Sequence, residues 1–105
     1  MASYDIAWAA GLFEGEGTVT RTKGIPRLAL KMTDFEPVRR FASIVEVGKI
    51  YGPYGYDYKD KIVRKPFLYW VAMADEAVEV ALVLEPWLCE RRQQQIAGIL
   101  EGVLV

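Results

Sequence analysis

The sequence of 105 residues contains no histidine and a single cysteine, Cys89. The missing histidine excludes Ser-His-Asp and Cys-His triads, zinc sites built on histidine, and nucleases that use a histidine base. One cysteine cannot form a disulfide within the chain, so we expect a buried, inert thiol and a reducing, cytoplasmic location. Hydrolytic chemistry would therefore depend on carboxylates, lysine or arginine, water and a hard metal ion.

Long apolar runs are also missing. Gly, Glu, Lys or Arg interrupts every run before about 18 apolar residues accumulate, which excludes a transmembrane helix and a membrane partner. The first five residues lack the basic start of a signal peptide. Apolar residues still make up 52% of the chain, enough for a packed core, and the length predicts one domain over residues 1–105.

The formal net charge of −1 argues against a nucleic-acid partner, but the charges are unevenly distributed. Residues 1–20 carry three acids and no base, residues 21–65 carry eleven bases and five acids, and residues 66–105 carry two bases and six acids. A basic middle between acidic ends would present one cationic surface to a polyanion. A solvated face of mixed charge explains the same pattern equally well.

Apolar spacing and turn residues predict the order α-β-β-α-β-β-α-α. The predicted helices cover residues 3 to 13 or 14, a segment capped by Thr33 or Asp34 and ended by Gly48, residues 75–84, and residues 88–104. The predicted strands are 18–23, 27–32, 49–51 and 67–74, with a long hairpin loop over 52–61.

Alternation in the predicted strand 27–32 turns every second side chain towards the core. The inward set is Leu28, Leu30 and Met32, and the outward set is Arg27, Ala29 and Lys31. We also expect three large aromatic side chains in the core, those of Trp8, Phe41 and Trp87.

The segment Ala9–Gly17 has the most informative chemistry. Glu14 and Glu16 end a helix that is unusually small on the side of Ala7, Ala10 and Gly11. A helix C-terminus carries a partial negative charge, so two carboxylates there are unfavourable unless a cation is present. If the helix pairs with its own copy, four carboxylates meet, and Mg²⁺ or Ca²⁺ would relieve the repulsion. The alternative is that both glutamates are solvated and the small side packs inside the monomer.

This segment resembles the LAGLIDADG motif of homing endonucleases. Ala9 stands for the first leucine, Phe13 replaces the isoleucine, and the residues between them match in kind. Glu14 and Glu16 replace the two aspartates of the motif, Gly15 stands for its second alanine, and Gly17 matches its final glycine.

Three further features are similar to the same family. The predicted element order agrees, and Leu28–Asp34 looks like the end of the second strand of the family. Glu85–Leu88 followed by Arg91–Gln94 looks like its Pro-aromatic-Leu turn and the polar start of its last helix. The resemblance implies an α+β fold of order αββαββα(α), with a four-stranded antiparallel sheet and helices on one face.

One motif per chain implies a homodimer and a near-palindromic double-stranded DNA site. In the family, the motif helices of the two subunits pack through their small faces. Carried over by position, this places Ala7, Ala10, Gly11 and Glu14 at the dimer interface. The side chain of Glu14 would support the turn by hydrogen bonding rather than bind metal directly.

The resemblance implies Mg²⁺-dependent hydrolysis of both DNA strands across the minor groove, with Ca²⁺ or Mn²⁺ as possible substitutes. By position, Glu16 is a metal ligand and the carbonyl of Gly15 a second one. Asp34 would lie near the attacking water, although a helix N-cap is an equal alternative. Arg91 aligns best with the basic catalytic residue, and Arg92 is its rival. Glutamate for aspartate and arginine for lysine both depart from the common pattern.

The resemblance also places the sheet of each subunit in the major groove of DNA. Candidate base-reading residues are Thr20, Thr22, Arg27, Ala29, Lys31, Tyr51, Arg64 and Trp70. Candidate phosphate contacts are Arg21, Lys23, Lys59, Lys61 and Lys65. Tyr54, Tyr56 and Tyr58 would either contact the DNA or pack the hairpin loop down.

Three functions compete at this point. The first is an active homing-type endonuclease of an intron or phage mobile element, which the retained Glu16 favours. The second is a non-cleaving DNA- or RNA-binding protein of the same fold, such as a maturase or a regulator. The third is a dimeric scaffold without nucleic acid. The sequence pI of about 5.4 favours the second and third, whereas the basic middle argues against the third.

Overall fold

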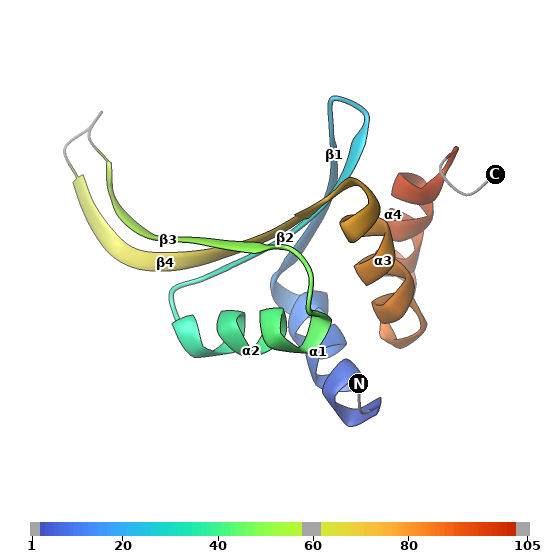
Figure 1. Cartoon of the computed structure of the whole chain (residues 1–105), viewed down its shortest axis with the longest axis horizontal. Helices are drawn as coiled ribbons and strands as arrows, with labels where there is room; N and C mark the ends of the chain where they lie inside the picture. The colour runs from blue at the N-terminus through green and yellow to red at the C-terminus, as the bar shows by residue number, and fades with distance from the viewer. Residues whose placement is uncertain (1–2, 58–61, 103–105) are drawn as a thin grey trace.

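A computed structural model describes residues 3–57 and 62–102, without the side chains of 56–57 and 62–64 (Figure 1). The elements are α1 (Ser3–Glu16), β1 (Gly17–Thr22), β2 (Ile25–Met32), α2 (Phe35–Val45), β3 (Lys49–Asp57), β4 (Ile62–Met73), α3 (Ala74–Leu84), the 3₁₀ helix η1 (Glu85–Trp87) and α4 (Glu90–Leu100). This α+β order agrees with the prediction. No helix in these described ranges has the length and apolar character needed to cross a membrane.

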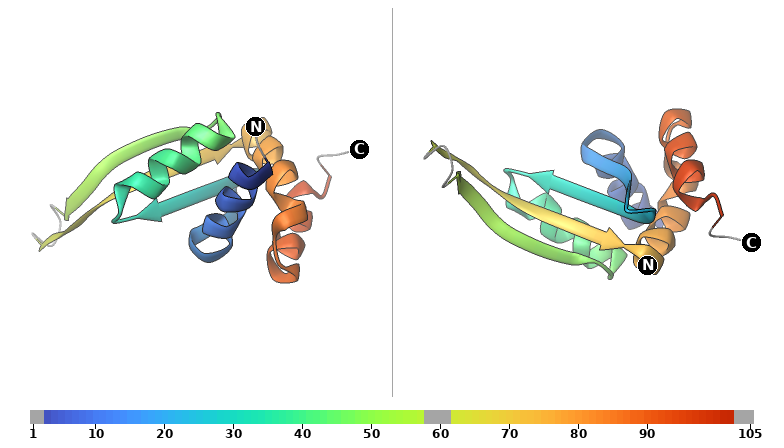
Figure 2. Two further views of the ribbon diagram at one scale, coloured as in Figure 1. Left: turned by 90° about the horizontal axis from the view of Figure 1, so that it is seen from below. Right: turned by 90° about the horizontal axis from the view of Figure 1, so that it is seen from above.

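The sheet has four antiparallel strands in the order β1-β2-β4-β3. Its helices lie on one face, as predicted: α2 is in front of the strands when seen from below and behind them when seen from above (Figure 2). On the other face, the β1–β2 hairpin and the far end of the β3–β4 arm both rise away from α1 and α2 (Figure 1). The sheet therefore presents an open, concave outer face.

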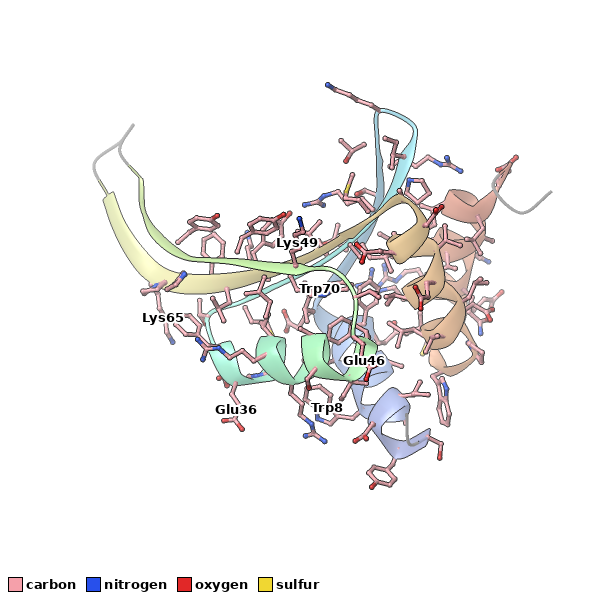
Figure 3. All side chains as sticks on the ribbon, in the orientation of Figure 1. Trp8, Glu36, Glu46, Lys49, Lys65 and Trp70 are labelled. Carbon is pink, nitrogen blue, oxygen red and sulfur yellow. The ribbon has the colours of Figure 1, made fainter. Side chains whose placement is uncertain are left out.

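The core lies between the helices and the inner face of the sheet. Phe13 of α1, Phe41 of α2 and Trp70 of β4 are fully buried. The Phe41 ring centroid is 6.1 Å from that of Phe13 and 4.8 Å from that of Trp70. Trp70 also donates its indole N–H to the carbonyl of Val47 at 3.0 Å. The prediction that Trp70 contacts DNA is therefore wrong, because its side chain is on the helix side of the sheet (Figure 3).

The turn between α2 and β3 requires glycine at position 48. Gly48 has φ +87°, and a Cβ there would lie 2.5 Å from Trp70 Nε1 and 2.8 Å from the carbonyl oxygen of Val71. The helix itself ends earlier than predicted, at Val45, and Glu46 follows in the left-handed conformation with φ 64°. Close packing on the indole thus fixes this turn.

The β3–β4 hairpin is longer than predicted. β3 continues to Asp57 and β4 begins at Ile62, so most of the expected loop 52–61 is strand. The glycines and proline that indicated a loop are accommodated by register shifts between Tyr51 and Tyr54 and between Tyr54 and Tyr56. Such irregularities bend a strand without ending it. Tyr58, Lys59 and Lys61 lie outside the described residues, as does the side chain of Tyr56.

Several predicted core residues are less buried than expected. Phe41, Leu28 and Leu30 are buried as predicted, and Met32 is half-buried. Trp8 is also half-buried and packs under the guanidinium of Arg40, whose Cζ lies 4.1 Å from the ring centroid. Trp87 is 51% exposed and Cys89 is exposed, so both predictions of burial are wrong. Their segment forms an outer corner, and Leu84 and Leu88 fill the core on either side of Trp87.

Candidate active site and nucleic-acid interface

The end of α1 is a tight corner that exposes a carboxylate. Glu16 is the last residue of the helix, and β1 begins at the next residue, Gly17. A Cβ at Gly17 would lie 2.5 Å from the ring of the buried Phe13, so only glycine lets the chain pass over that ring. Glu16 and Gly15 are both exposed. The corner therefore holds the predicted metal ligands on the surface.

Arg92 of α4 binds the backbone of this corner. Its side chain is only 6% exposed. Nε and Nη2 each donate to the carbonyl oxygen of Glu14 at 3.2 Å, and Nη2 also donates to that of Gly17 at 2.7 Å. The last carbonyls of a helix have no partner within the helix. One guanidinium therefore supplies hydrogen bonds to carbonyls on both sides of Gly15 and Glu16.

The positive charge of Arg92 lies at the end of α1, beside the two glutamates, where we expected a cation. Burial lowers the pKa of Arg92, the neighbouring positive charge of Arg91 lowers it further, and the Glu14 carboxylate raises it. Arginine keeps its proton in folded proteins, so the guanidinium remains charged. It faces the helix end that carries a partial negative charge, and it offsets part of the repulsion between the two glutamates.

Glu14 anchors α4 to α1. Its Oε1 accepts a hydrogen bond of 2.7 Å from the backbone N–H of Cys89, the N-cap residue of α4. The expected supporting role of Glu14 is therefore present, but it supports the start of α4 rather than the turn that follows α1. Of the two glutamates, Glu16 is the one whose carboxylate extends into solvent.

From Ala7 to Gly15, one side of α1 is open and nearly without side chains, whereas the exposed Tyr4 stands at its start. Gly11 and Gly15 are exposed, and a Cβ at either would meet no atom within 4 Å. Ala7 is half-buried and lies on the same side, because residues four apart share a helix face. Ala10 is fully buried in the single chain, so its predicted place at a dimer interface is wrong. The exposed small face, defined here as Ala7, Gly11 and Gly15, differs from the predicted one.

The corner offers hard oxygen donors but too few for a complete metal site. Among the residues that the structure describes, no three His, Cys, Asp or Glu side chains gather to hold a metal ion. One chain presents the carboxylate of Glu16 and the carbonyl of Gly15, donors that suit Mg²⁺ and Ca²⁺. Because these cations take six or more oxygen ligands, the donor chemistry fits but further ligands must come from a second copy, DNA phosphate or water.

Asp34 and Arg91 have different relationships to the corner. Asp34 is exposed at the N-cap of α2 and makes no side-chain cap hydrogen bond. Gly17 pairs with Leu30, and Asp34 lies two residues beyond Met32, where β2 ends. Arg91 is exposed in the first turn of α4, beside the residue that contacts Glu14 and Gly17. Among the described residues, no hydrogen bond joins either side chain to the corner, and α4 places Arg91 next to Arg92, which does bind it.

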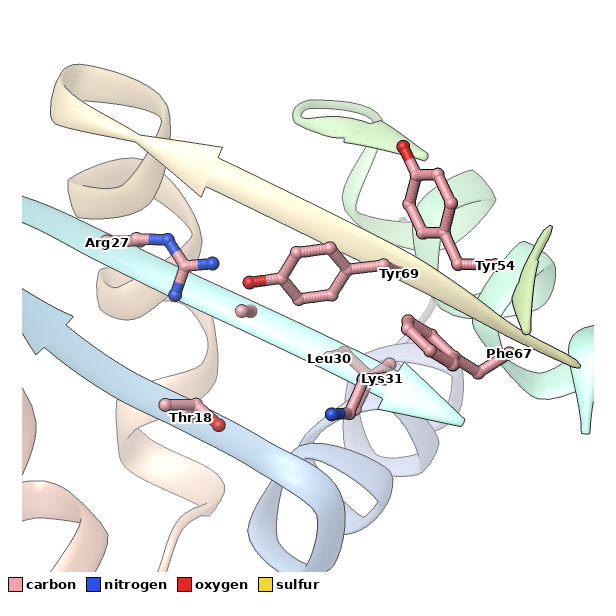
Figure 4. Close-up of a pocket in the computed structure, with 8 residues that line it drawn as sticks. Thr18, Arg27, Leu30, Lys31, Tyr54, Phe67 and Tyr69 are labelled. Carbon is pink, nitrogen blue, oxygen red and sulfur yellow. The ribbon is translucent and has the colours of Figure 1, made fainter. Parts of the chain in front are cut away.

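The outer face of the sheet holds a groove of about 410 Å³ (Figure 4). Aromatic rings support its basic side chains: Arg27 Cζ lies 5.4 Å from the Tyr69 ring centroid, and Lys31 Nζ lies 5.1 Å from that of Phe67. Tyr54 packs edge-on against Phe67 at 5.9 Å. Phe67 and Tyr69 were not predicted to belong to this surface. In β4 the register pairs Tyr69 with Lys31 on this face and Trp70 with Leu30 on the inner face.

Most of the other predicted DNA contacts are on accessible surface. Thr20, Thr22 and Tyr51 are exposed, and so are Lys23 and Lys65. Lys49, which the prediction omitted, extends from the outer face of the sheet (Figure 3). Ala29 is 3% exposed and forms part of the groove lining beneath longer side chains, which leaves it little surface for a base contact. The side chain of Arg64 lies outside the described part of the structure.

Arg21 has a structural role instead of the predicted phosphate contact. Its Nη2 donates to the carbonyl oxygens of Gly98 at 2.9 Å, Ile99 at 3.0 Å and Glu101 at 2.9 Å. Its Nη1 donates to Gly24 at 3.0 Å within the hairpin. The guanidinium therefore caps the C-terminus of α4. The prediction fails because Arg21 pairs with Pro26 on the inner side of the hairpin, next to α4.

No protein-family model and no curated protein matches the chain. Among solved structures, the chain is similar to the homing endonuclease I-CvuI in complex with its target (Sro1.3) in the presence of 2 mM Ca, with a TM-score of 0.62 and 14% identity over 93% of this chain and 69% of that one. A structure of I-CvuI with the I-CreI target (C1221) and 2 mM Mg, in which the DNA is not cleaved, gives a TM-score of 0.60 with the same identity and coverage. The chain therefore has the fold of a homing endonuclease.

Proposed function

We propose that the chain is one subunit of a homodimeric, divalent-cation-dependent DNA endonuclease of the LAGLIDADG type. The observation that carries this proposal is an exposed acidic residue, Glu16, at the end of a helix whose outer side is bare at Gly11 and Gly15. The fold shared with an endonuclease bound to its DNA target supports it. The proposed reaction is hydrolysis of both strands of a near-palindromic site across the minor groove.

The proposed dimer forms through the exposed small face of α1. The empty space around Gly11 and Gly15 allows a second helix backbone to approach closely. A twofold axis beside these glycines brings the two α1 ends, and hence both Glu16 carboxylates, near each other. Each subunit then supplies the ligands that the other lacks.

In this dimer, Glu16 and the Gly15 carbonyl of each subunit would hold Mg²⁺. The chemistry that such a cation supplies is Lewis-acid polarisation of water and of phosphate oxygens. The guanidinium of Arg91 would bind the phosphate and stabilise its developing charge. The exposed carboxylate of Asp34 would take the proton of an attacking water that lies between the corner and the N-cap of α2. Arg91 remains charged throughout, so the leaving oxygen takes its proton from solvent.

The concave face of the sheet is the proposed DNA-reading surface. Arg27 and Lys31 extend from β2 with their charges against aromatic rings, which restricts them to few rotamers before DNA binds. Both suit the acceptors of guanine in the major groove. Thr20, Thr22, Tyr51 and Lys49 extend the same surface onto the neighbouring strands.

A second candidate, a non-cleaving DNA- or RNA-binding protein of this fold, is favoured by one specific contact. Arg92 already offsets the negative charge at the end of α1 through the carbonyls of Glu14 and Gly17. Both glutamates can therefore persist without a cation, and the retention of Glu16 alone does not require nuclease activity.

Binding-site selection followed by cleavage separates the candidates. A duplex selected from a randomised DNA library by the wild-type protein is incubated with Mg²⁺, and cut products are resolved on a denaturing gel. We expect cutting by the wild type and by Glu79→Gln, a matched change at an exposed glutamate of α3. Glu16→Gln should bind the duplex but not cut it. Binding without cutting by the wild type would favour the second candidate, and no salt-dependent binding would reject both.

A further inference from the structure

We propose that Arg92 is the positioning residue of the metal site, holding Glu16 in place through the backbone on either side of it. This inference rests on the proposed function, in which Glu16 binds the cation. Arg92 itself is buried and reaches carbonyl oxygens rather than solvent, so its effect on the cation passes through Glu16.

The geometry is that of a clamp around two residues. The carbonyls of Glu14 and Gly17 lie immediately before and after Gly15 and Glu16, and a single guanidinium binds both. The clamp is itself fixed, because Nη1 donates to Gln95 Oε1 at 3.0 Å and Cζ lies 5.7 Å from the Phe13 ring centroid. The planar fork of arginine can make these bonds together, whereas the single ammonium of lysine cannot span them.

The corner needs such a clamp because its own residues restrain it weakly. Glu16 lies between two glycines, the residues with the greatest backbone freedom. Glutamate also has one more rotatable bond than the aspartate of the family motif. A site must hold its ligands within about 0.5 Å of the working geometry, so restraint from α4 compensates for this added freedom.

Arg92 has two roles, positioning Glu16 and supplying a positive charge, and the loss of each role has the opposite effect on cation binding. Removing the positive charge of Arg92 would make the corner more negative and strengthen the attraction for a divalent cation. Removing the clamp would loosen Glu16 and weaken cation binding. Arg92→Lys separates the two effects, because it keeps the charge and removes the fork.

Arg21→Lys is the matched control. Arg21 also caps a helix with one guanidinium, but at the opposite end of α4, on the carbonyls of Gly98, Ile99 and Glu101. The α4 carbonyls that Arg21 binds lie roughly 10 Å along the helix from Arg92. Both variants lose comparable hydrogen bonds, and only one of them touches the corner of Glu16.

The experiment is a calorimetric titration of Ca²⁺ into the protein bound to its selected duplex, together with thermal melting and the Mg²⁺ concentration for half-maximal cutting. We expect Arg92→Lys to weaken Ca²⁺ binding about tenfold, the loss typical of groups that orient metal ligands, and to raise the Mg²⁺ midpoint similarly. DNA affinity measured without metal should stay within about twofold of wild type, since Arg92 makes no surface contact. Arg21→Lys should melt earlier but bind Ca²⁺ within about twofold of wild type.

Equal Ca²⁺ affinities for Arg92→Lys and Arg21→Lys would overturn the positioning role of Arg92 but leave the proposed metal site standing. If wild-type Ca²⁺ binding does not depend on Glu16, as judged with Glu16→Gln, the metal site itself is rejected and the inference falls with it. Should Arg92→Lys fail to fold, Gln95→Leu tests the same clamp, since it removes the acceptor of Nη1 and leaves Arg92 in place. We expect it to weaken Ca²⁺ binding two- to threefold, and unchanged affinity would count against the clamp.

Discussion

Arg21 and Arg92 each cap the C-terminus of a helix where α1, β1 and α4 meet: Arg21 caps α4, and Arg92 caps α1. Arg92 of α4 binds carbonyls at the end of α1, and Arg21 of β1, the strand that follows α1, binds the last carbonyls of α4. Each segment therefore satisfies the unpaired backbone groups of the other. The reciprocal contact fixes α4 against the α1–β1 corner, where Glu16 is exposed.

Removing the α4 cap should destabilise the fold without changing the corner. Arg21→Met is expected to lower the free energy of unfolding by about 1–3 kcal/mol, the loss typical of charged hydrogen bonds. Denaturant unfolding measures this loss, and amide exchange should quicken in the last turn of α4. Lys23→Met, at an exposed hairpin residue, should change stability by less than about 0.5 kcal/mol. Similar losses for the two variants would contradict the cap.

Alanine at Gly11 should separate the stability of the monomer from its self-association. The new Cβ meets no atom within the chain, so helix propensity should stabilise the monomer by about 0.5–1 kcal/mol. The same methyl should hinder close packing of two α1 helices and weaken the dimer at least about tenfold. Analytical ultracentrifugation and thermal melting measure the two effects.

The control for this change is Gly98→Ala in α4, where a Cβ also meets nothing. It should raise stability similarly and leave the association constant unchanged. A wild type that stays monomeric at every concentration would contradict the proposed dimer. Equal dimer affinities for the Gly11 and Gly98 variants would place the interface elsewhere.

Alanine should lower the free energy of unfolding more at Gly48 than at Gly24, although both glycines have positive φ. Gly48→Ala adds a left-handed alanine and a clash with Trp70 and the Val71 carbonyl, and we expect a loss of about 2–4 kcal/mol. Gly24→Ala has a similar φ of +81° but no atom within 4 Å, so only the backbone cost of about 1–2 kcal/mol applies. Urea unfolding compares the two. Equal losses would mean that the indole moves aside freely.

The order of the elements could be predicted because periodicity and turn residues agreed along most of the chain. The face of β4 could not be predicted. Residues 67–71 are all aromatic or aliphatic, so no alternation indicates which side is inward, and a shift of one residue exchanges the faces. The pairing of Leu30 with Trp70 decides it. The rings of Phe67 and Tyr69 consequently replace Trp70 on the outer face.

The roles of Arg91 and Arg92 were also beyond sequence analysis. Successive helix residues point about 100° apart, so the packing of α4 on β1, β2 and the end of α1 decides which arginine is buried. The packing of α1 on α2, α3 and the sheet buries Ala10 and leaves Gly11 and Gly15 bare. What the sequence did indicate was the need for a cation beside Glu14 and Glu16, and Arg92 supplies its charge there.

Alanine substitutions on the outer face of the sheet should weaken DNA binding because they remove contacts to bases. Arg27→Ala and Lys31→Ala are each expected to cost about 1–3 kcal/mol on the selected duplex and to relax its sequence preference at one position per half-site. Fluorescence anisotropy at several salt concentrations measures affinity, and repeated site selection measures the preference. The control is Arg39→Ala, which removes an exposed arginine from α2 on the helix side of the sheet. Since Arg39 lies on the face turned away from the proposed DNA, its loss should leave both affinity and preference unchanged. If Arg39→Ala weakens binding as much as Arg27→Ala does, the DNA lies on the helix side and the concave face is not the reading surface.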